Sequence, residues 1–405
     1  MQLIIPESEF EIMEIVRSCM TRGGKLRVLG ARQSHPPMLA AADAAISMEK
    51  MTGVVSIDKR SATVTVRSGT LVDQLCLELW DTGFCLLGLG SVSGQTIGGL
   101  VATGSHAQGI HQGSVSSYVL AMRLIDGRGQ LLVLKKEDDP DAFNAFPVSF
   151  GCLGIVTELT LAIVPRYFID STTELFNYRE NPDRVMDLVI NTASIVRIRP
   201  ELGLAKATLI LTSSTNTGSE RLMRSIDSLT LKSSLYDSQF KIGFGRKAWL
   251  RAKRWQMRCK MKLLRIPRND QGMRRTEYAI PLDQAPKVIH LIEQHYRSNY
   301  PYLRGFLVIR SAKADDLWLS NCQGATMCYV ACHVYCDPHY SQHFDRLEDI
   351  MQRHDGRPHW GKEFKDSIQN FEHIYPKWND FKRLRDEMDP YRLFENEWQE
   401  MVMSR

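Results

Sequence analysis

A glycine-rich stretch between Gly88 and Gly109 constrains this chain more than any other feature. It holds seven glycines in 22 residues, in the run GLGSVSGQTIGGLVATGSHAQG. Glycine loses more conformational entropy on folding than other residues and adds no side chain to the core. So many glycines indicate that the backbone approaches something closely and presents its N–H groups to it, as in backbone cradles that hold phosphate. The stretch therefore predicts a site for a phosphorylated cofactor.

The overall composition is that of a globular protein with two or three domains. The chain has 405 residues, of which 43% are hydrophobic and 24% charged. Its first residues lack a basic segment followed by an apolar one, and no run of about 18 uncharged apolar residues follows. We therefore expect a cytoplasmic protein. Nine cysteines without CxxC spacing predict free thiols rather than disulfides or a zinc site.

The N-terminal half alternates short strands and helices. A strand over residues 25–30 ends at Gly30, and the turn at residues 31–37 has a backbone that can surround a phosphate. The sequence Asp126-Gly127-Arg128-Gly129 between two apolar runs predicts a hairpin. The remaining patterns predict helices over residues 7–21, 72–79 and 141–146, and strands over 45–48, 54–57, 62–66, 118–125, 130–134 and 155–164.

Positive charge is concentrated in one segment. The chain carries +5 overall, but residues 241–268 hold 11 Lys or Arg and no acidic residue, so the rest is net negative. Within residues 246–266 the basic side chains fall on one helical stripe, opposite Trp249 and Trp255. We favour a surface helix that packs its apolar face on the protein. Peripheral contact with an anionic membrane or an acidic partner is the alternative. No nucleic-acid binding is expected, because the rest of the chain would repel phosphates.

The order of these motifs carries a resemblance to a known family. The Gly-Ala-x-x-Ser turn, the run Gln-Thr-Ile-Gly-Gly, the run Ala-Thr-Gly-Ser-His and the segment 149–158 resemble the PCMH-type FAD-binding domain of the vanillyl-alcohol-oxidase superfamily. The C-terminal motifs are similar to those of its sugar-1,4-lactone oxidase branch, which includes gulonolactone, arabinonolactone, galactonolactone and alditol oxidising enzymes. These motifs are Arg274–Pro281, Ile309–Ser320, Gly356–Lys362, and Asp389-Pro390 with Phe394 and Asn396.

The resemblance covers nearly the whole chain and implies an α+β fold. It implies a two-subdomain FAD-binding domain over residues 1–166. A mixed-sheet substrate or cap domain over residues 167–405 follows, with a C-terminal helical segment that returns to the flavin. The cofactor would lie between the two domains.

The resemblance also implies which residues hold FAD. The pyrophosphate would lie on backbone N–H groups of the Gly30–His35 turn and of residues 103–109, and Ile155 and Val156 would meet the adenosine end. The implied cofactor residues are Gly30, Ala31, Arg32, Gln33, Ser34, His35, Gly98, Gly99, Thr103, Gly104, Ser105, His106, Gly109, Ile155 and Val156.

Three positions depart from the family pattern. Gln33 stands where many members carry the histidine that binds FAD covalently, so we expect non-covalent FAD, and attachment through His35 instead is disfavoured. Val308 stands where the lactone and alditol enzymes carry the glutamate of a Glu-x-Arg pair, although Arg310 is retained. Leu100 stands where alditol oxidases carry a serine that binds substrate. The last two changes predict a more apolar substrate pocket.

The expected chemistry is hydride transfer to FAD from a C–H centre that bears oxygen, in an alcohol, lactone or related small molecule. Arg310 and Lys362 are candidates for stabilising negative charge and binding substrate, and His359 is either a base or a structural residue. No metal is expected, because His333, Asp315 and Asp316 lack ligand spacing. The electron acceptor is O2 or another compound. The alternatives are a non-catalytic flavin-fold module, or a membrane-associated oxidase of a lipid-linked sugar.

Overall fold

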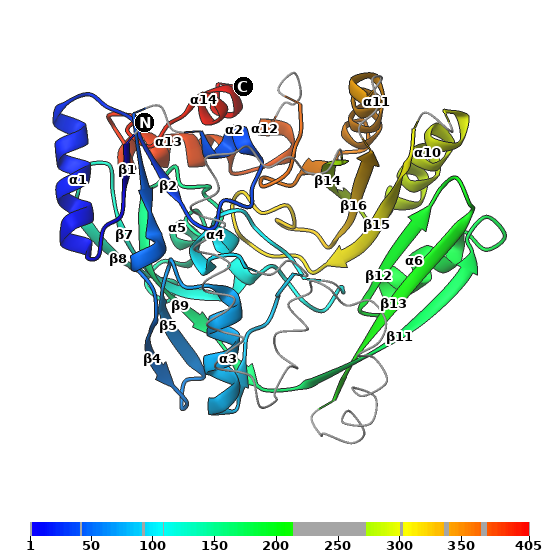
Figure 1. Ribbon diagram of the computed structural model, residues 1–405, viewed down its shortest axis with the longest axis horizontal. Helices are drawn as coiled ribbons and strands as arrows, with labels where there is room; N and C mark the ends of the chain where they lie inside the picture. The colour runs from blue at the N-terminus through cyan, green and yellow to red at the C-terminus, as the bar shows by residue number, and fades with distance from the viewer. Residues whose placement is uncertain are drawn as a thin grey trace.

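A computed structural model describes residues 2–404, apart from 41–42, 91–93, 108, 214–272, 300–302, 336–339 and 366–370. The predicted basic helix at residues 246–266 lies outside the described residues. Figure 1 shows a lobe built from the first part of the chain beside a second lobe built on a larger sheet. The described cysteines are free thiols, as expected.

The N-terminal lobe contains two main sheets. A parallel sheet has the strand order β1-β3-β2, and an antiparallel sheet has the order β4-β5-β9-β7-β8. Strand β9 buries every second residue, as a strand with one face on the core should. The strands are β1 (Gln2–Ile4), β2 (Leu26–Leu29), β3 (Ala44–Ser47), β4 (Val54–Asp58), β5 (Thr63–Arg67), β7 (Val119–Ile125), β8 (Leu131–Lys135) and β9 (Ile155–Ala162). The predicted strands and the hairpin are confirmed.

Capping residues stabilise some helix ends of this lobe. The hydroxyl of Ser8 accepts from the N–H of Glu11 at the start of α1, and α3 ends at Gly83, whose φ of 89° suits glycine. The helices are α1 (Glu9–Thr21), α2 (Pro36–Leu39), η1 (Met48–Lys50), α3 (Val72–Thr82), α4 (Ile97–Ala102), η2 (Val115–Tyr118) and α5 (Pro140–Phe143). Helix α4 runs through the glycine-rich stretch, where the sequence did not predict one.

Strands β6 (Phe84–Cys85) and β10 (Val164–Pro165) form a short antiparallel pair. The second lobe is built on a seven-stranded antiparallel sheet. Its strand order is β11-β13-β12-β15-β16-β14-β17. Strands β15 and β16 are buried along almost their whole length, because both faces of the sheet are covered. The strands are β11 (Phe168–Asn177), β12 (Ser194–Arg199), β13 (Leu204–Ser213), β14 (Met273–Pro281), β15 (Gly305–Ala312), β16 (Met327–Tyr335) and β17 (Arg357–Pro358).

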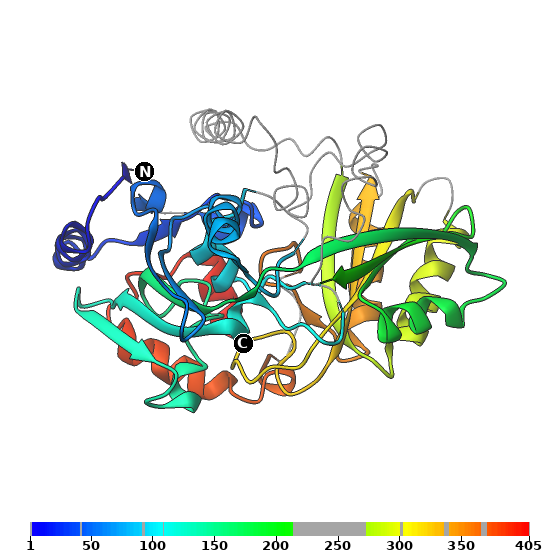
Figure 2. The same ribbon diagram turned by 90° about the horizontal axis from the view of Figure 1, so that it is seen from below.

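Three helices lie on one face of this sheet, and the other face turns toward the N-terminal lobe (Figure 2). Helices α6 (Asp183–Asn191) and α11 (Tyr340–Gln352) contact strands β12, β15 and β16, and α10 (Ala285–Ser298) packs on α11. The hydroxyl of Ser311 in β15 donates to the carbonyl of Val189 in α6, at 2.7 Å. Because side chains alternate along a strand, Val308 and Arg310 point to the opposite face.

The C-terminal helices return to the N-terminal lobe. They are α12 (Phe371–Ile374), α13 (Trp378–Met388) and α14 (Glu397–Met403), and Figure 1 shows α13 and α14 beside the first strands. The N–H of Leu26 donates to the carbonyl of Leu393 at 2.8 Å, and the amide of Asn396 donates to the carbonyl of Ala40 at 2.9 Å. Among the described helices, none combines the length and the apolar character needed to cross a membrane.

Candidate active site

Two glycines let separate segments of the N-terminal lobe approach closely around a cavity. A Cβ atom on Gly30 would overlap Oγ1 of Thr96, and one on Gly98 would lie 2.8 Å from Cβ of Ser68. Thr96 is also the N-cap of α4, and its Oγ1 accepts from the N–H of Gly99. The end of β2, the start of α4 and the residues after β5 therefore meet here. Substituting either glycine would push these segments apart.

Most of the residues expected at the cofactor line this cavity. The lining includes Gly30, Ala31, Arg32, Gln33, Ser34, Gly98, Gly99, Thr103 and Val156. Arg27, Arg32 and Ser68 also line this cavity, and the Nε atoms of both arginines and the hydroxyl of Ser68 are buried without a hydrogen-bond partner among the described residues. Unpaired buried donors are costly, so a ligand with phosphate and polar ring atoms fits this lining.

Other expected cofactor residues do not line the cavity. The N–H groups of Gly104, Ser105 and Gly109 donate to the carbonyls of Val101, Leu100 and Ser311. They are therefore not available to hold a phosphate. The N–H of His35 donates to the carbonyl of Gly361, and Ile155 lies in the core. Leu100 is buried in α4 at the cavity wall.

A second group of polar side chains lies on the face of the large sheet that turns toward the N-terminal lobe. Glu277 in β14 and Val308 in β15 both pair with Ala331 in β16, so the three residues form one row across the sheet. Arg310 lies two residues further along β15, on the same face of the sheet, and its Nη2 atom donates to Oε1 of Glu277 at 2.5 Å. The ammonium of Lys362 lies 4.0 Å from Oε2 of the same carboxylate.

This arrangement places a carboxylate beside Arg310, although Val308 stands where the family pattern has a glutamate. Val308 does leave an apolar side chain at its own position, but Glu277 brings a carboxylate to Arg310 from another strand. In the sequence, Glu277 stands out only as part of the motif Arg274–Pro281. Its role depends on a strand order in which β14 and β15 both flank β16, and the order of the residues along the chain does not give that.

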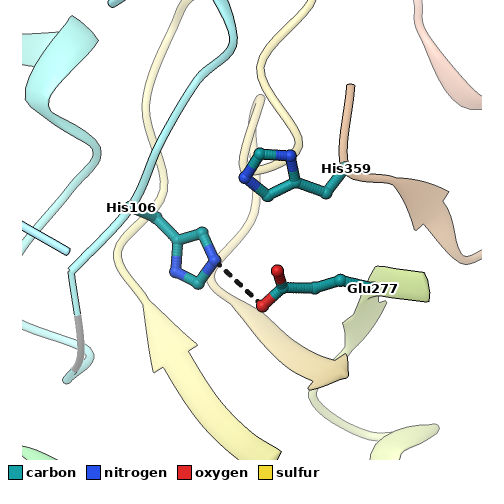
Figure 3. Close-up of side chains that lie close together, drawn as sticks. All are labelled: His106, Glu277 and His359. Atoms are coloured by element: carbon teal, nitrogen blue, oxygen red, sulfur yellow. Dashed lines mark ion pairs between the residues drawn. The ribbon is translucent and has the colours of Figure 1, made fainter. Parts of the chain in front are cut away.

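Two histidines complete the cluster (Figure 3). The ring of His106 stacks on Tyr329 with 3.4 Å between centroids, and its Nε2 atom lies 3.4 Å from Oε1 of Glu277. The backbone N–H of His359 donates to the carbonyl of Glu277 at 2.9 Å. The next residue, Trp360, is fully buried among aromatic side chains and donates to the carbonyl of Leu319, which fixes the turn that carries His359 and Lys362.

Hydrogen-bond distances favour one tautomer of each neutral histidine. Both ring nitrogens of His106 face acceptors, with the carbonyl of Ala107 2.9 Å from Nδ1 and Oε1 of Glu277 3.4 Å from Nε2, and the shorter contact favours the proton on Nδ1 and the lone pair on Nε2. Nδ1 of His359 accepts from the N–H of Gly361 at 3.0 Å, so its proton is on Nε2. In their neutral forms, His106 therefore presents an acceptor from Nε2 and His359 a donor.

Burial and charge set the protonation states. Burial, together with the charge of Arg310, lowers the pKa of His106 below its ordinary value of 6.5, although Glu277 opposes the shift. Burial lowers the pKa of His359 to about 3. Burial alone would raise the pKa of Glu277, but Arg310, with help from His106 and Lys362, holds it well below its ordinary value. At neutral pH the cluster therefore holds a carboxylate, two cations and two neutral imidazoles.

The distances alone would also allow a metal ion. Ligand atoms of His106, Glu277 and His359 all lie within 4.8 Å of one another. However, Arg310 and Lys362 already neutralise Glu277 and would repel a divalent ion. The expectation of no metal stays a prediction. Asp315 accepts from the N–H of Leu317 and from the hydroxyl of Ser320, which makes it a turn residue.

Comparison with known proteins places both regions in families. Residues 2–135 match the FAD binding domain family, and residues 255–402 match the D-arabinono-1,4-lactone oxidase family. The chain is 24% identical to an L-gulono-1,4-lactone dehydrogenase of Mycobacterium tuberculosis, over 99% of this chain and 95% of that protein. It is 27% identical to the L-gulonolactone oxidase of Mus musculus, over 98% and 94%. It is 36% identical to a D-arabinono-1,4-lactone oxidase of Eremothecium gossypii, over 43% of this chain and 33% of that protein.

These matches and the glycine-lined cavity define the class as an FAD-dependent oxidoreductase that acts on CH–OH groups. The matches do not favour a non-catalytic module. Within that class, the chain belongs to the sugar-lactone oxidase branch of the vanillyl-alcohol-oxidase superfamily.

Proposed function

We propose that this protein oxidises a CH–OH group of a sugar-1,4-lactone or a closely related polyhydroxylated compound, with FAD held non-covalently. The observation that carries this proposal is the buried contact of Arg310 with Glu277 beside Lys362, His106 and His359. A carboxylate, a guanidinium and an ammonium give acceptors and donors for several hydroxyl groups. The names of the relatives, which are lactone oxidases and dehydrogenases, support the same substrate class.

Each residue of the cluster has a role in this proposal that follows from its chemistry. FAD, when bound, supplies the hydride acceptor. Glu277 accepts hydrogen bonds from substrate hydroxyls, and Arg310 offers its buried Nε, which has no partner among the described residues. Lys362 and Arg310 outnumber the single carboxylate, so the cluster carries a net positive charge that stabilises negative charge developing on the substrate oxygen.

His106 is the proton acceptor in this proposal, in place of His359. A base needs a lone pair, and neutral His106 presents one at Nε2 while His359 presents an N–H. The lone pair faces Oε1 of Glu277 at 3.4 Å, an unfavourable pairing of two acceptors. When His106 takes a proton from the substrate hydroxyl, this repulsion is replaced by an attraction, because the imidazolium then lies beside a carboxylate. His359 donates to the substrate oxygen.

Gln33 supports the non-covalent cofactor, since its amide cannot form an imidazole-flavin bond, and it donates to the carbonyl of Gly94. The parallel and antiparallel sheets of the N-terminal lobe are, in this proposal, the two subdomains of a PCMH-type domain. A cytoplasmic location, the electron acceptor and a partner for residues 246–266 stay predictions.

The test is an anaerobic spectrum of the purified yellow protein. We expect acid precipitation to release the flavin into the supernatant, and L-gulono-1,4-lactone or D-arabinono-1,4-lactone to bleach the absorbance near 450 nm, which is about the usual band of oxidised flavin. Bleaching by simple aliphatic alcohols but by neither lactone would contradict the substrate class. Flavin retained in the pellet would contradict the non-covalent link.

A further inference from the structure

The cavity of the N-terminal lobe is lined by positive charge without a counter-charge. Among the described residues that line it, the charged ones are Arg27 and Arg32, and none is acidic. Arg27 lies on β2 and is only 6% exposed. Arg32 follows in the turn after Gly30, and the two side chains therefore reach the same cavity from one short segment.

Both arginines have an unmet donor. Their Nε atoms are buried and make no hydrogen bond within the described part of the chain. Burial lowers the pKa of Arg27 to about 10, which still leaves the guanidinium charged at neutral pH. A buried charge is unfavourable unless an opposite charge accompanies it. The arginines therefore indicate that an anionic ligand occupies the cavity.

The backbone at Arg32 is strained in a way that points to the same conclusion. Its φ is 55°, in the left-handed region that favours glycine. Such strain persists where the surrounding structure or a function requires that side chain. An arginine in this place adds a second guanidinium to the residues that line the cavity.

We propose that Arg27 and Arg32 together bind the pyrophosphate of FAD. Two guanidinium groups match two negative charges, and each can donate two hydrogen bonds to phosphate oxygens. The proposal also supplies donors in place of the N–H groups of Gly104, Ser105 and Gly109, which are already used within the protein. It rests on FAD as the cofactor of the proposed function, and not on the identity of the substrate.

The test measures flavin affinity in protein freed of flavin, by quenching of flavin fluorescence. FAD carries the pyrophosphate and riboflavin does not. We expect Arg32→Gly and Arg27→Met each to weaken FAD binding by about 10-fold or more, and to leave riboflavin binding within about twofold, because hydrogen bonds to charged groups are among the strong ones. Inorganic pyrophosphate should compete with FAD in the wild type and not in Arg32→Gly, whereas adenosine should compete equally in both.

Stability of the flavin-free protein separates binding from folding. Glycine suits the φ of Arg32, and methionine removes an unpaired buried charge, so neither variant should lower the melting temperature. Ala62→Gly is the matched control, since Ala62 has a φ of 51° and does not line the cavity; its FAD affinity should equal that of the wild type.

Two results would overturn the proposal. One is an unchanged FAD affinity in both arginine variants, and the other is an equal loss for FAD and riboflavin, which would place the arginines at the ring. Failure of the proposed function looks different. In that case the wild type and the variants still differ in FAD binding, but neither lactone bleaches the bound flavin.

Discussion

The cavity of the N-terminal lobe and the cluster around Glu277 both contain arginine, but only in the cluster does the arginine contact an acidic side chain. In the cavity, Arg27 and Arg32 have no acidic neighbour among the described lining residues. In the cluster, Arg310 donates to Glu277 at 2.5 Å, and Lys362 lies near the same carboxylate. In our proposals, the charge of the cavity is balanced by an anionic ligand, whereas the cluster already holds paired charges and binds a neutral, hydroxyl-bearing molecule. The two regions should respond oppositely when a charge is removed.

The largest effect is expected from Glu277→Gln. It leaves the largely buried Arg310 without its carboxylate, and breaking a buried pair in this way costs about 3–5 kcal/mol. We expect the free energy of unfolding in urea to fall by that order, and lactone oxidation to be lost. Arg27→Met, which removes a charge that has no partner in the flavin-free protein, should instead leave the unfolding free energy unchanged or higher.

Glu348→Gln is the matched control for this change. Glu348 is also fully buried, but its neighbours are the hydroxyl of Tyr278 and the N–H of Lys365 rather than an arginine. Burial raises its pKa to about 7, so part of the population is already neutral near that pH. Equal losses in Glu277→Gln and Glu348→Gln would contradict the role given to the ion pair of Glu277 with Arg310.

The next effect is expected from His106→Gln. An amide cannot accept the substrate proton, so kcat should fall by about 10²–10⁴-fold, with little change in stability. In the wild type, activity requires neutral His106. It is therefore present above the pKa of His106 and lost as the pH falls through it, with a midpoint below 6.5.

The pH profile of lactone oxidation distinguishes the two histidines. The acid midpoint should disappear in His106→Gln. It should persist in His359→Gln, because the ring of His359 in the wild type already carries its proton on Nε2. An acid midpoint retained in His106→Gln would show that another group takes the proton.

The sequence predicted the local parts of both regions. Alternating β-branched residues gave the strands around the cavity, and the glycine pattern placed Gly30, Gly98 and Gly99 at its wall. These features depend on near neighbours in the chain. The helix α4 was missed because a six-residue element holding two glycines has weak helix propensity, and its N-cap Thr96 supplies the missing stability.

The sequence did not reveal the contact between Glu277 and Arg310. These residues lie 33 positions apart, on strands separated by β16, which comes later in the chain than either. Only the strand order shows that Glu277 shares a row with Val308. The same limit applies to Gly109, whose N–H was expected to hold phosphate but donates to the carbonyl of Ser311 in the large sheet.

The smallest effect is expected where the cavity depends on close approach rather than charge. Gly30→Ala places a Cβ against Oγ1 of Thr96, and overpacking of this kind costs about 1–3 kcal/mol of unfolding free energy. Thr96→Ala alone should cost about 1 kcal/mol through the lost N-cap. In the double variant the overlap is gone, so the combined loss should be smaller than the sum of the two single losses, as urea unfolding of the flavin-free proteins can measure. Strictly additive losses would mean that Gly30 is needed for another reason than this contact.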